Sequence, residues 1–164
     1  MLSRNFGPSR EDEIRLQWEE LNQGAATILG FAALCQRAML QTTATEPELI
    51  NQQLSQEAKA ILVASRNRGT LDIRAMRESF DSAERFLAVC VEHELNCHKL
   101  FLDKMQPEQT IRFLQGFKEL CNAGFVIHHL QKDFSLSAKG FDYARTIEPA
   151  DVQTLLDFAT EIEL

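Results

Sequence analysis

Apolar residues recur every three or four positions through most of this chain, a spacing that is typical of amphipathic helices. The first such run begins after Ser9, which forms a capping-box pattern with Asp12, and continues to about Gln41. The same spacing predicts two further helices, over Thr45–Ser65 and Leu71–Glu94. The sequence therefore predicts that most of the first half of the chain is helical, with breaks at Thr42–Glu46 and Arg66–Gly69.

The first predicted helix carries an apolar seam whose members alternate steps of four and three residues over more than three heptads. Its members are Ile14, Trp18, Leu21, Ala25, Ile28, Ala32, Cys35 and Met39. A second apolar stripe (Leu29, Phe31, Leu34 and Leu40) widens the apolar face toward the end of the helix. A heptad seam of this length packs along another helix. We therefore predict a homodimer, or a complex with a protein partner, formed through this seam.

The middle of the chain has the pattern of two helices joined by a tight turn. Asn96 fits the cap of a short helix, Cys97–Met105. Pro107 fits the first position of a second helix, Pro107–Ala123. Gly124 follows at the position where a glycine commonly ends a helix. The pattern predicts a helix-turn-helix unit.

A short β-hairpin is predicted directly after this unit. Phe125–Ile127 is a β-favouring run, His128–Asp133 can turn the chain, and Phe134–Leu136 alternates like a return strand. Two final helices are expected over Ala138–Thr146 and Pro149–Ile162.

Three segments of this region resemble the recognition helix, the helix stop and the wing of winged-helix domains: Thr110–Phe113, Leu120–Val126 and Phe134–Gly140. The resemblance covers about 60 residues, roughly 80–145, and is to bacterial transcription regulators such as the MarR and PadR groups. It implies a mainly α fold with a small β-hairpin wing, a winged helix-turn-helix core with long flanking helices. The expected organisation is N-terminal packing and dimerisation helices over 1–66, a winged-helix domain over 67–146 and an acidic C-terminal helix over 147–164.

Winged-helix regulators lay one helix in the DNA major groove, so the polar face of Pro107–Ala123 is the candidate DNA contact. Arg and Gln side chains on that face read guanine and adenine edges. Glu108 and Glu119 share the face and oppose phosphate. The candidate contacts to double-stranded DNA are Gln109, Arg112, Gln115, Lys99, His129 and Lys132.

The charge balance leaves two functions open. The net charge of −7 is unusual for a nucleic-acid-binding protein. Residues 65–147 carry 12 basic and 11 acidic side chains, whereas residues 148–164 carry five acids and no base, so the acid lies in the flanks. The first is a dimeric DNA-binding transcription regulator, which the turn at Gln106-Pro107 and the helix start Thr110–Phe113 favour. The other, which the acidic flanks favour, is a winged-helix protein-interaction module, a subunit of a larger assembly that does not contact DNA.

The sequence carries no motif for catalysis, such as a phosphate-binding glycine loop, a nucleophile elbow or a helical His-Glu-x-x-His. The four cysteines lack paired spacing and are expected to be reduced core thiols. Cys90, His93, Cys97 and His98 suggest a zinc site, but core packing accounts better for the two cysteines. No secretory signal and no membrane-spanning apolar run is visible. We expect a cytoplasmic, non-enzymatic protein without metal, cofactor or membrane association.

Overall fold

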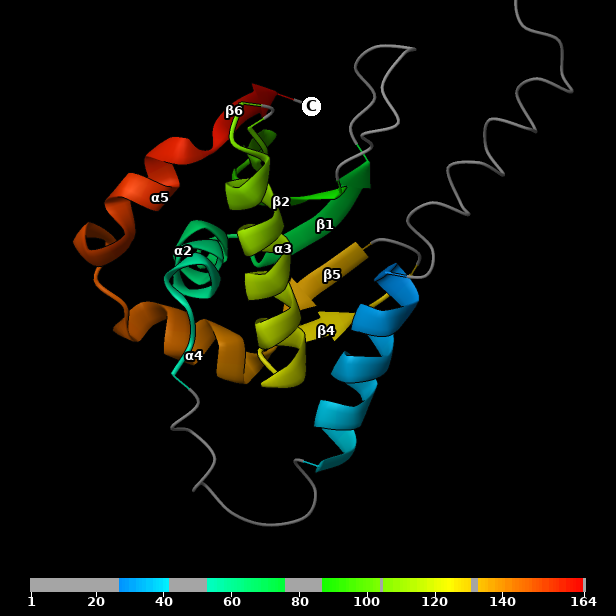
Figure 1. Ribbon diagram of the computed structural model, residues 1–164. Helices are drawn as coiled ribbons and strands as arrows, with labels where there is room; N and C mark the ends of the chain where they lie inside the picture. The colour runs from blue at the N-terminus through cyan, green and yellow to red at the C-terminus, as the bar shows by residue number, and fades with distance from the viewer. Residues whose placement is uncertain (1–26, 42–52, 76–86, 104, 131–132, 164) are drawn as a thin grey trace, which may run out of the picture.

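A six-stranded antiparallel sheet forms the centre of the molecule, and its helices pack against it (Figure 1). The computed structural model describes residues 27–41, 53–75, 87–103, 105–130 and 133–163. The order of the strands across the sheet is β4-β5-β1-β2-β3-β6. Their bounds are β1 (Thr70–Ala75), β2 (Leu87–Glu94), β3 (Cys97–Phe101), β4 (Val126–His128), β5 (Asp133–Leu136) and β6 (Thr160–Glu163).

The two faces of the sheet differ because side chains alternate along each strand. In β1, Leu71 and Ile73 are buried in the main core, while Asp72 and Arg74 lie on the other face as an ion pair of 2.7 Å. The apolar run of β2 is buried on both faces, because Val89 and Val91 belong to the main core while Ala88 and Cys90 pack in a second, smaller apolar cluster with Leu100, Leu102 and Ile162. A two-residue turn joins β2 to β3, and its second residue, Asn96, has a left-handed φ of 63°.

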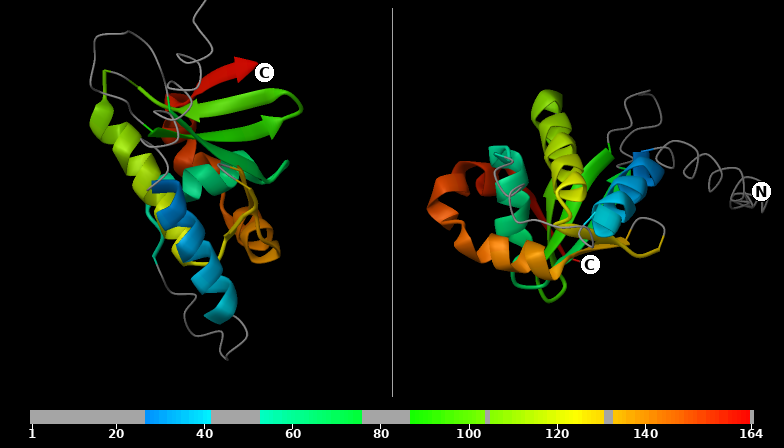
Figure 2. Two further views of the ribbon diagram at one scale, coloured as in Figure 1. Left: turned by 90° about the vertical axis from the view of Figure 1, so that its right-hand side faces the viewer. Right: turned by 90° about the horizontal axis from the view of Figure 1, so that it is seen from below.

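The described helices are residues 27–41 (helix 27–41 below), α2 (Gln56–Ser65), α3 (Pro107–Asn122), α4 (Ala138–Thr146), the 3-10 turn η2 (Pro149–Val152) and α5 (Gln153–Phe158). Two begin at serine caps: Ser55 accepts the Ala58 N–H at 3.2 Å, and Ser137 accepts the Gly140 N–H at 3.0 Å. Figure 2 shows helix 27–41 beside α3, at the β4–β5 side of the sheet.

Two phenylalanines of α3 join the layers. The Phe117 ring lies between Phe31 of helix 27–41 and Phe134 of β5, with centroid distances of 5.2 and 5.0 Å. One turn earlier, the Phe113 ring lies 4.3 Å from the Phe101 ring of β3. All of these rings are nearly or fully buried, so α3 is the helix around which the main core forms.

The predicted mainly α fold, with only a small hairpin wing, is wrong. Leu71–Glu94, predicted as a helix, contains strands β1 and β2, and Cys97–Met105 contains strand β3. Asn96 turns a hairpin and does not cap a helix. The predicted helix Pro149–Ile162 is divided into η2, α5 and β6.

Other predicted elements are confirmed. Helix α3 ends before Gly124, which has a left-handed φ of 76°. Strands β4 and β5 form the predicted hairpin within one residue of the expected bounds, and α4 has the expected ones. The hairpin is not a separate wing, however, because β5 also pairs with β1 and so extends the large sheet.

Candidate functional site

Helix 27–41 and α3 lie side by side and run in the same direction (Figure 1). Three contacts along them join residues that are the same distance apart in sequence: Phe31 with Phe117, Cys35 with Cys121, and Ala38 with Gly124. Arg37 adds a hydrogen bond of 3.3 Å from its guanidinium to the side-chain oxygen of Asn122. The two helices are therefore in a fixed parallel register over two turns.

Helix 27–41 is apolar on nearly all sides. Arg37 is its one charged residue in the 15 that the structure describes. Phe31 and Cys35 face the core and are 5% and 1% exposed, whereas Leu29 and Leu40 are 69% and 68% exposed. A soluble surface helix ordinarily has a polar face opposite its apolar one. The outward stripe of this helix, defined as Leu29, Ala33, Gln36 and Leu40, has the 4-3-4 spacing of a helix-packing seam.

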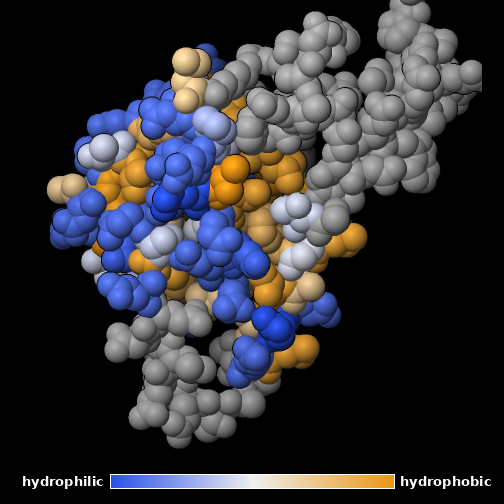
Figure 3. Space-filling view, in the orientation of Figure 1, coloured by the Kyte–Doolittle hydropathy of each residue, from blue (hydrophilic) through white to orange (hydrophobic). Residues whose placement is uncertain are grey.

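An apolar groove runs between helix 27–41 and the first half of α3. It encloses about 460 Å³ and is lined by Thr27, Gly30, Phe31, Leu34, Ile111, Leu114, Gln115 and Lys118. Ile111 is 55% exposed, and a Cβ added at Gly30 would meet no atom within 4 Å. Figure 3 shows apolar residues between these two helices. The outward stripe and this groove together form one apolar surface around helix 27–41.

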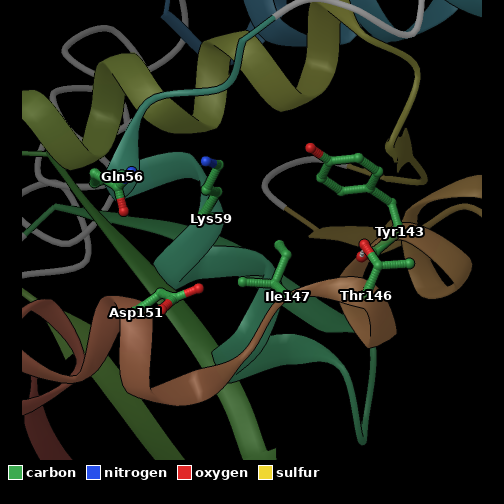
Figure 4. A pocket seen from close by; sticks show the side chains of 6 residues that line it. All are labelled: Gln56, Lys59, Tyr143, Thr146, Ile147 and Asp151. Atoms are coloured by element: carbon green, nitrogen blue, oxygen red, sulfur yellow. Dashed lines mark hydrogen bonds between the residues drawn. The ribbon is translucent and has the colours of Figure 1, made fainter.

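A polar pocket lies on the other side of the molecule's helical layer, between α2, α4 and η2 (Figure 4). It encloses about 470 Å³, and its lining residues are Gln56, Lys59, Tyr143, Thr146, Ile147 and Asp151. The Lys59 ammonium and the Tyr143 hydroxyl point into it from facing walls, and the Asp151 carboxylate lies on a third. Its chemistry suits a small polar ligand, but the chain offers no neighbouring nucleophile or buried acid–base pair among the residues that line it.

The candidate DNA-contacting residues of α3 already have partners or line the groove. The exposed Arg112 guanidinium donates to the Glu108 carboxylate at 2.7 Å, and this hydrogen bond and the charge of Glu108 raise the pKa of Arg112 above its ordinary value. Gln109 donates to the Glu57 carboxylate at 3.2 Å. Gln115 lines the apolar groove. The α3 surface thus presents paired charges.

The remaining candidates do not gather around α3. Lys99 lies on β3 and pairs with Glu161 of β6 at 3.0 Å. His129 follows β4, near the opposite edge of the sheet, and its ring contacts the Ser135 hydroxyl at 2.7 Å. Strands β5, β1 and β2 separate β4 from β3, which at about 4.8 Å a step is roughly 19 Å. Lys132 lies outside the described residues.

The predicted dimer seam is divided between two environments. Its first four members, Ile14, Trp18, Leu21 and Ala25, lie outside the described residues. Of the others, Cys35 faces α3, Ile28 and Ala32 are half-buried, and Met39 is 55% exposed. The outward stripe was not predicted as a seam, although the lack of a charged face in 27–41 is visible in the sequence.

No protein-family model, no curated protein and no solved structure matches the chain. In the part of the chain that the structure describes, no helix is long and apolar enough to cross a membrane. Cys90 and His98 lie on β2 and β3, and no group of three metal-ligating side chains comes together among the described residues.

Proposed function

We propose that this protein is a protein-interaction module, and that it assembles with a second copy of itself through helix 27–41. The observation that carries the proposal is the outward stripe of that helix, where Leu29 and Leu40 are 69% and 68% exposed directly opposite the core-facing residues. Exposed apolar surface of this kind is costly in a monomer and marks an interaction site.

The spacing of the stripe favours a second copy as the occupant. Steps of four, three and four residues bring one helix face against another along its length. Ala33 permits close approach, and Gln36 is a polar residue at a seam position, which in paired helices selects one register. Two identical stripes form a two-fold interface in which each leucine meets apolar surface of the partner copy.

The dimer is expected to be weak. Burial of four leucines from two copies contributes on the order of 6–12 kcal/mol before other terms. The loss of translational and rotational freedom on association opposes dimer formation by about 4–15 kcal/mol. The most favourable combination of these terms leaves about 8 kcal/mol, which corresponds to a Kd near 1 μM, so we expect association at micromolar or higher concentrations.

DNA binding has weaker support. Two of the candidate contacts with a described position are Lys or Arg residues, and both form ion pairs. Arg112 lies 2.7 Å from the Glu108 carboxylate, and Lys99 lies 3.0 Å from the Glu161 carboxylate. Binding to phosphate would require these ion pairs to break. Lys99 and His129 lie near opposite edges of the sheet, so the described candidate contacts are dispersed rather than gathered around α3.

Sedimentation velocity across roughly 1–100 μM protein tests the proposal, since this range brackets a micromolar Kd. Leu29→Glu places a charge in the outward stripe and should leave only monomer. Leu95→Glu is the matched control, because Leu95 is 67% exposed in the β2–β3 turn, away from helix 27–41, and this variant should dimerise like the wild type. Far-UV circular dichroism verifies that both variants are folded.

A wild type that stays monomeric over the whole range would overturn the proposal. The same preparation is mixed with labelled duplex DNA at about 20 mM salt, where phosphate attraction is strong. Binding that weakens with added salt and is lost in Arg112→Ala would favour the regulator function instead.

A further inference from the structure

Two thiols meet where helix 27–41 packs on α3. Cys35 and Cys121 are both free thiols, are 1% and 0% exposed, and lie between the Phe31–Phe117 and Ala38–Gly124 contacts, near enough for each to shift the pKa of the other. Phe31 packs on Phe117 one turn before them. The parallel register thus brings the two thiols together from neighbouring helices, and a disulfide forms when the sulfurs close to about 2.05 Å with the dihedral angle and Cα separation that the bond requires.

The two thiols differ in their chemistry. The hydrogen bond from the Cys121 thiol, together with backbone hydrogen bonds that include one from His128, lowers the pKa of Cys35 despite its burial. Burial, with the bond to Cys35, raises the pKa of Cys121. A thiolate is the nucleophile in thiol chemistry, so Cys35 is the sulfur that reacts first and Cys121 the one that resolves the product.

We propose that Cys35 and Cys121 form a reversible, peroxide-sensitive disulfide that fastens helix 27–41 to α3. The Cys35 thiolate attacks one oxygen of a hydroperoxide, the O–O bond breaks, and the leaving oxygen takes a proton and departs as water when the oxidant is hydrogen peroxide. The Cys121 thiol then attacks the sulfenic sulfur, the S–O bond breaks, and a second water leaves. Two thiols lose two electrons and two protons, and the peroxide is reduced.

Burial decides how fast this reaction proceeds. Since neither sulfur is accessible in the fully packed state, peroxide reaches Cys35 only through a local opening of the contact between helix 27–41 and α3 that leaves the two sulfurs side by side. Once formed, the disulfide removes that opening motion. The disulfide does not depend on self-association, because both cysteines belong to one chain and face the core rather than the outward stripe.

Peptide mapping by mass spectrometry tests the disulfide. The full chain is treated with hydrogen peroxide under native conditions, remaining thiols are alkylated, and the digest is compared with and without dithiothreitol. We expect a Cys35–Cys121 linked peptide, a mass loss of about 2 Da for the intact monomer, and full reversal by reductant. The melting temperature should rise by up to about 10 °C, because the link closes a loop of more than 80 residues.

Cys97→Ser is the control variant, because Cys97 lies half-buried on β3 and its loss should leave the disulfide unchanged. Cys121→Ser should instead give no linked peptide and leave Cys35 as a sulfenic acid that a dimedone probe labels. The proposal is overturned if Cys35 and Cys121 are both alkylated after peroxide has oxidised Cys97. It is equally overturned if the linked peptide joins other cysteines or two chains, which non-reducing electrophoresis distinguishes.

Discussion

Helices α2 and α3 approach each other closely at Gly116, in the middle of α3. A Cβ added at Gly116 would lie 2.8 Å from the backbone nitrogen of Ala58 and 3.1 Å from the carbonyl carbon of Glu57, both in α2. These atoms belong to the backbone, so the contact is relieved only by moving one helix away from the other. We predict that Gly116→Ala destabilises the protein, although alanine is the better helix former.

The size of the effect follows from two opposing terms. Alanine in place of glycine inside a helix stabilises by about 0.8–1.0 kcal/mol. Overpacking a core contact typically costs about 1–3 kcal/mol. Gly30 supplies the control, because it also lies inside a helix and a Cβ there would meet no atom within 4 Å. Gly30→Ala should therefore stabilise, and the two variants should differ by roughly 1–3 kcal/mol.

Urea denaturation followed by circular dichroism measures both variants against the wild type, with thermal melting as a second readout. A domain of this size shifts its melting temperature by about 2–4 °C for each kcal/mol. If Gly116→Ala stabilised the protein as much as Gly30→Ala, the α2 and α3 backbones could not approach as described. An unchanged denaturant slope in both variants is required for the comparison to hold.

Two further predictions concern polar contacts. Thr110 is fully buried, and its hydroxyl accepts the Asp103 N–H at 3.0 Å and donates to the Asp103 carbonyl, so Thr110→Val should cost about 1–3 kcal/mol in chemical denaturation whereas Thr110→Ser should retain both bonds. The hydrogen bond from Lys99, and then its charge, lower the pKa of the exposed Glu161 carboxyl. The contribution of this ion pair to stability is therefore present above the ordinary glutamate pKa, and it is lost as the pH falls through the lowered pKa of Glu161. Lys99→Gln should return the Glu161 pKa in an NMR titration toward its ordinary value, and an unchanged titration would exclude Lys99 as the cause.

The elements that sequence patterns predicted correctly have strong local signals. Pro107 and Gly124 mark the two ends of α3, and Ser137 marks the start of α4. The β4–β5 hairpin alternates apolar and polar residues over short runs, and its strands are neighbours in the chain. Each of these elements is specified by residues that lie close together in the chain, so the pattern alone was sufficient.

The elements that were predicted wrongly depend on distant partners. The apolar run at the start of β2 is buried on both faces, and a short continuous apolar run does not distinguish a central strand from a buried helix. Strand β3 becomes a strand because β2 and β6 hydrogen-bond to its two sides, and β6 is more than 60 residues away. Without these pairings, the period of three and four in the sequence favoured helices.

The candidate site was missed for a related reason. The heptad seam identified helix 27–41 as a packing helix, but the sequence did not indicate which of its apolar faces contacts the chain's own core. In the structure, Phe31 and Cys35 of helix 27–41 pack against α3, and Leu29 therefore lies on the opposite side of the helix. A face becomes a docking surface only once the competing face is occupied. The DNA-contact prediction likewise assumed that Arg112 and Lys99 were free to bind phosphate or bases. In the structure, Glu108 forms an ion pair with Arg112 and Glu161 forms one with Lys99.

Helix 27–41 therefore takes part in two contacts that can be separated by experiment. Its inward face carries Cys35, which meets Cys121 of α3, and its outward face carries the outward stripe. Cys35→Ser should therefore leave the sedimentation of the protein unchanged. Leu29→Glu should leave the reduced and oxidised peptide maps qualitatively unchanged. The two faces are coupled only through opening of the helix. If a dimer holds the helix in place, peroxide should oxidise Cys35 more slowly at high protein concentration than at low, and Leu29→Glu should remove this dependence. Equal rates at all concentrations would show that the helix lifts from α3 independently of assembly.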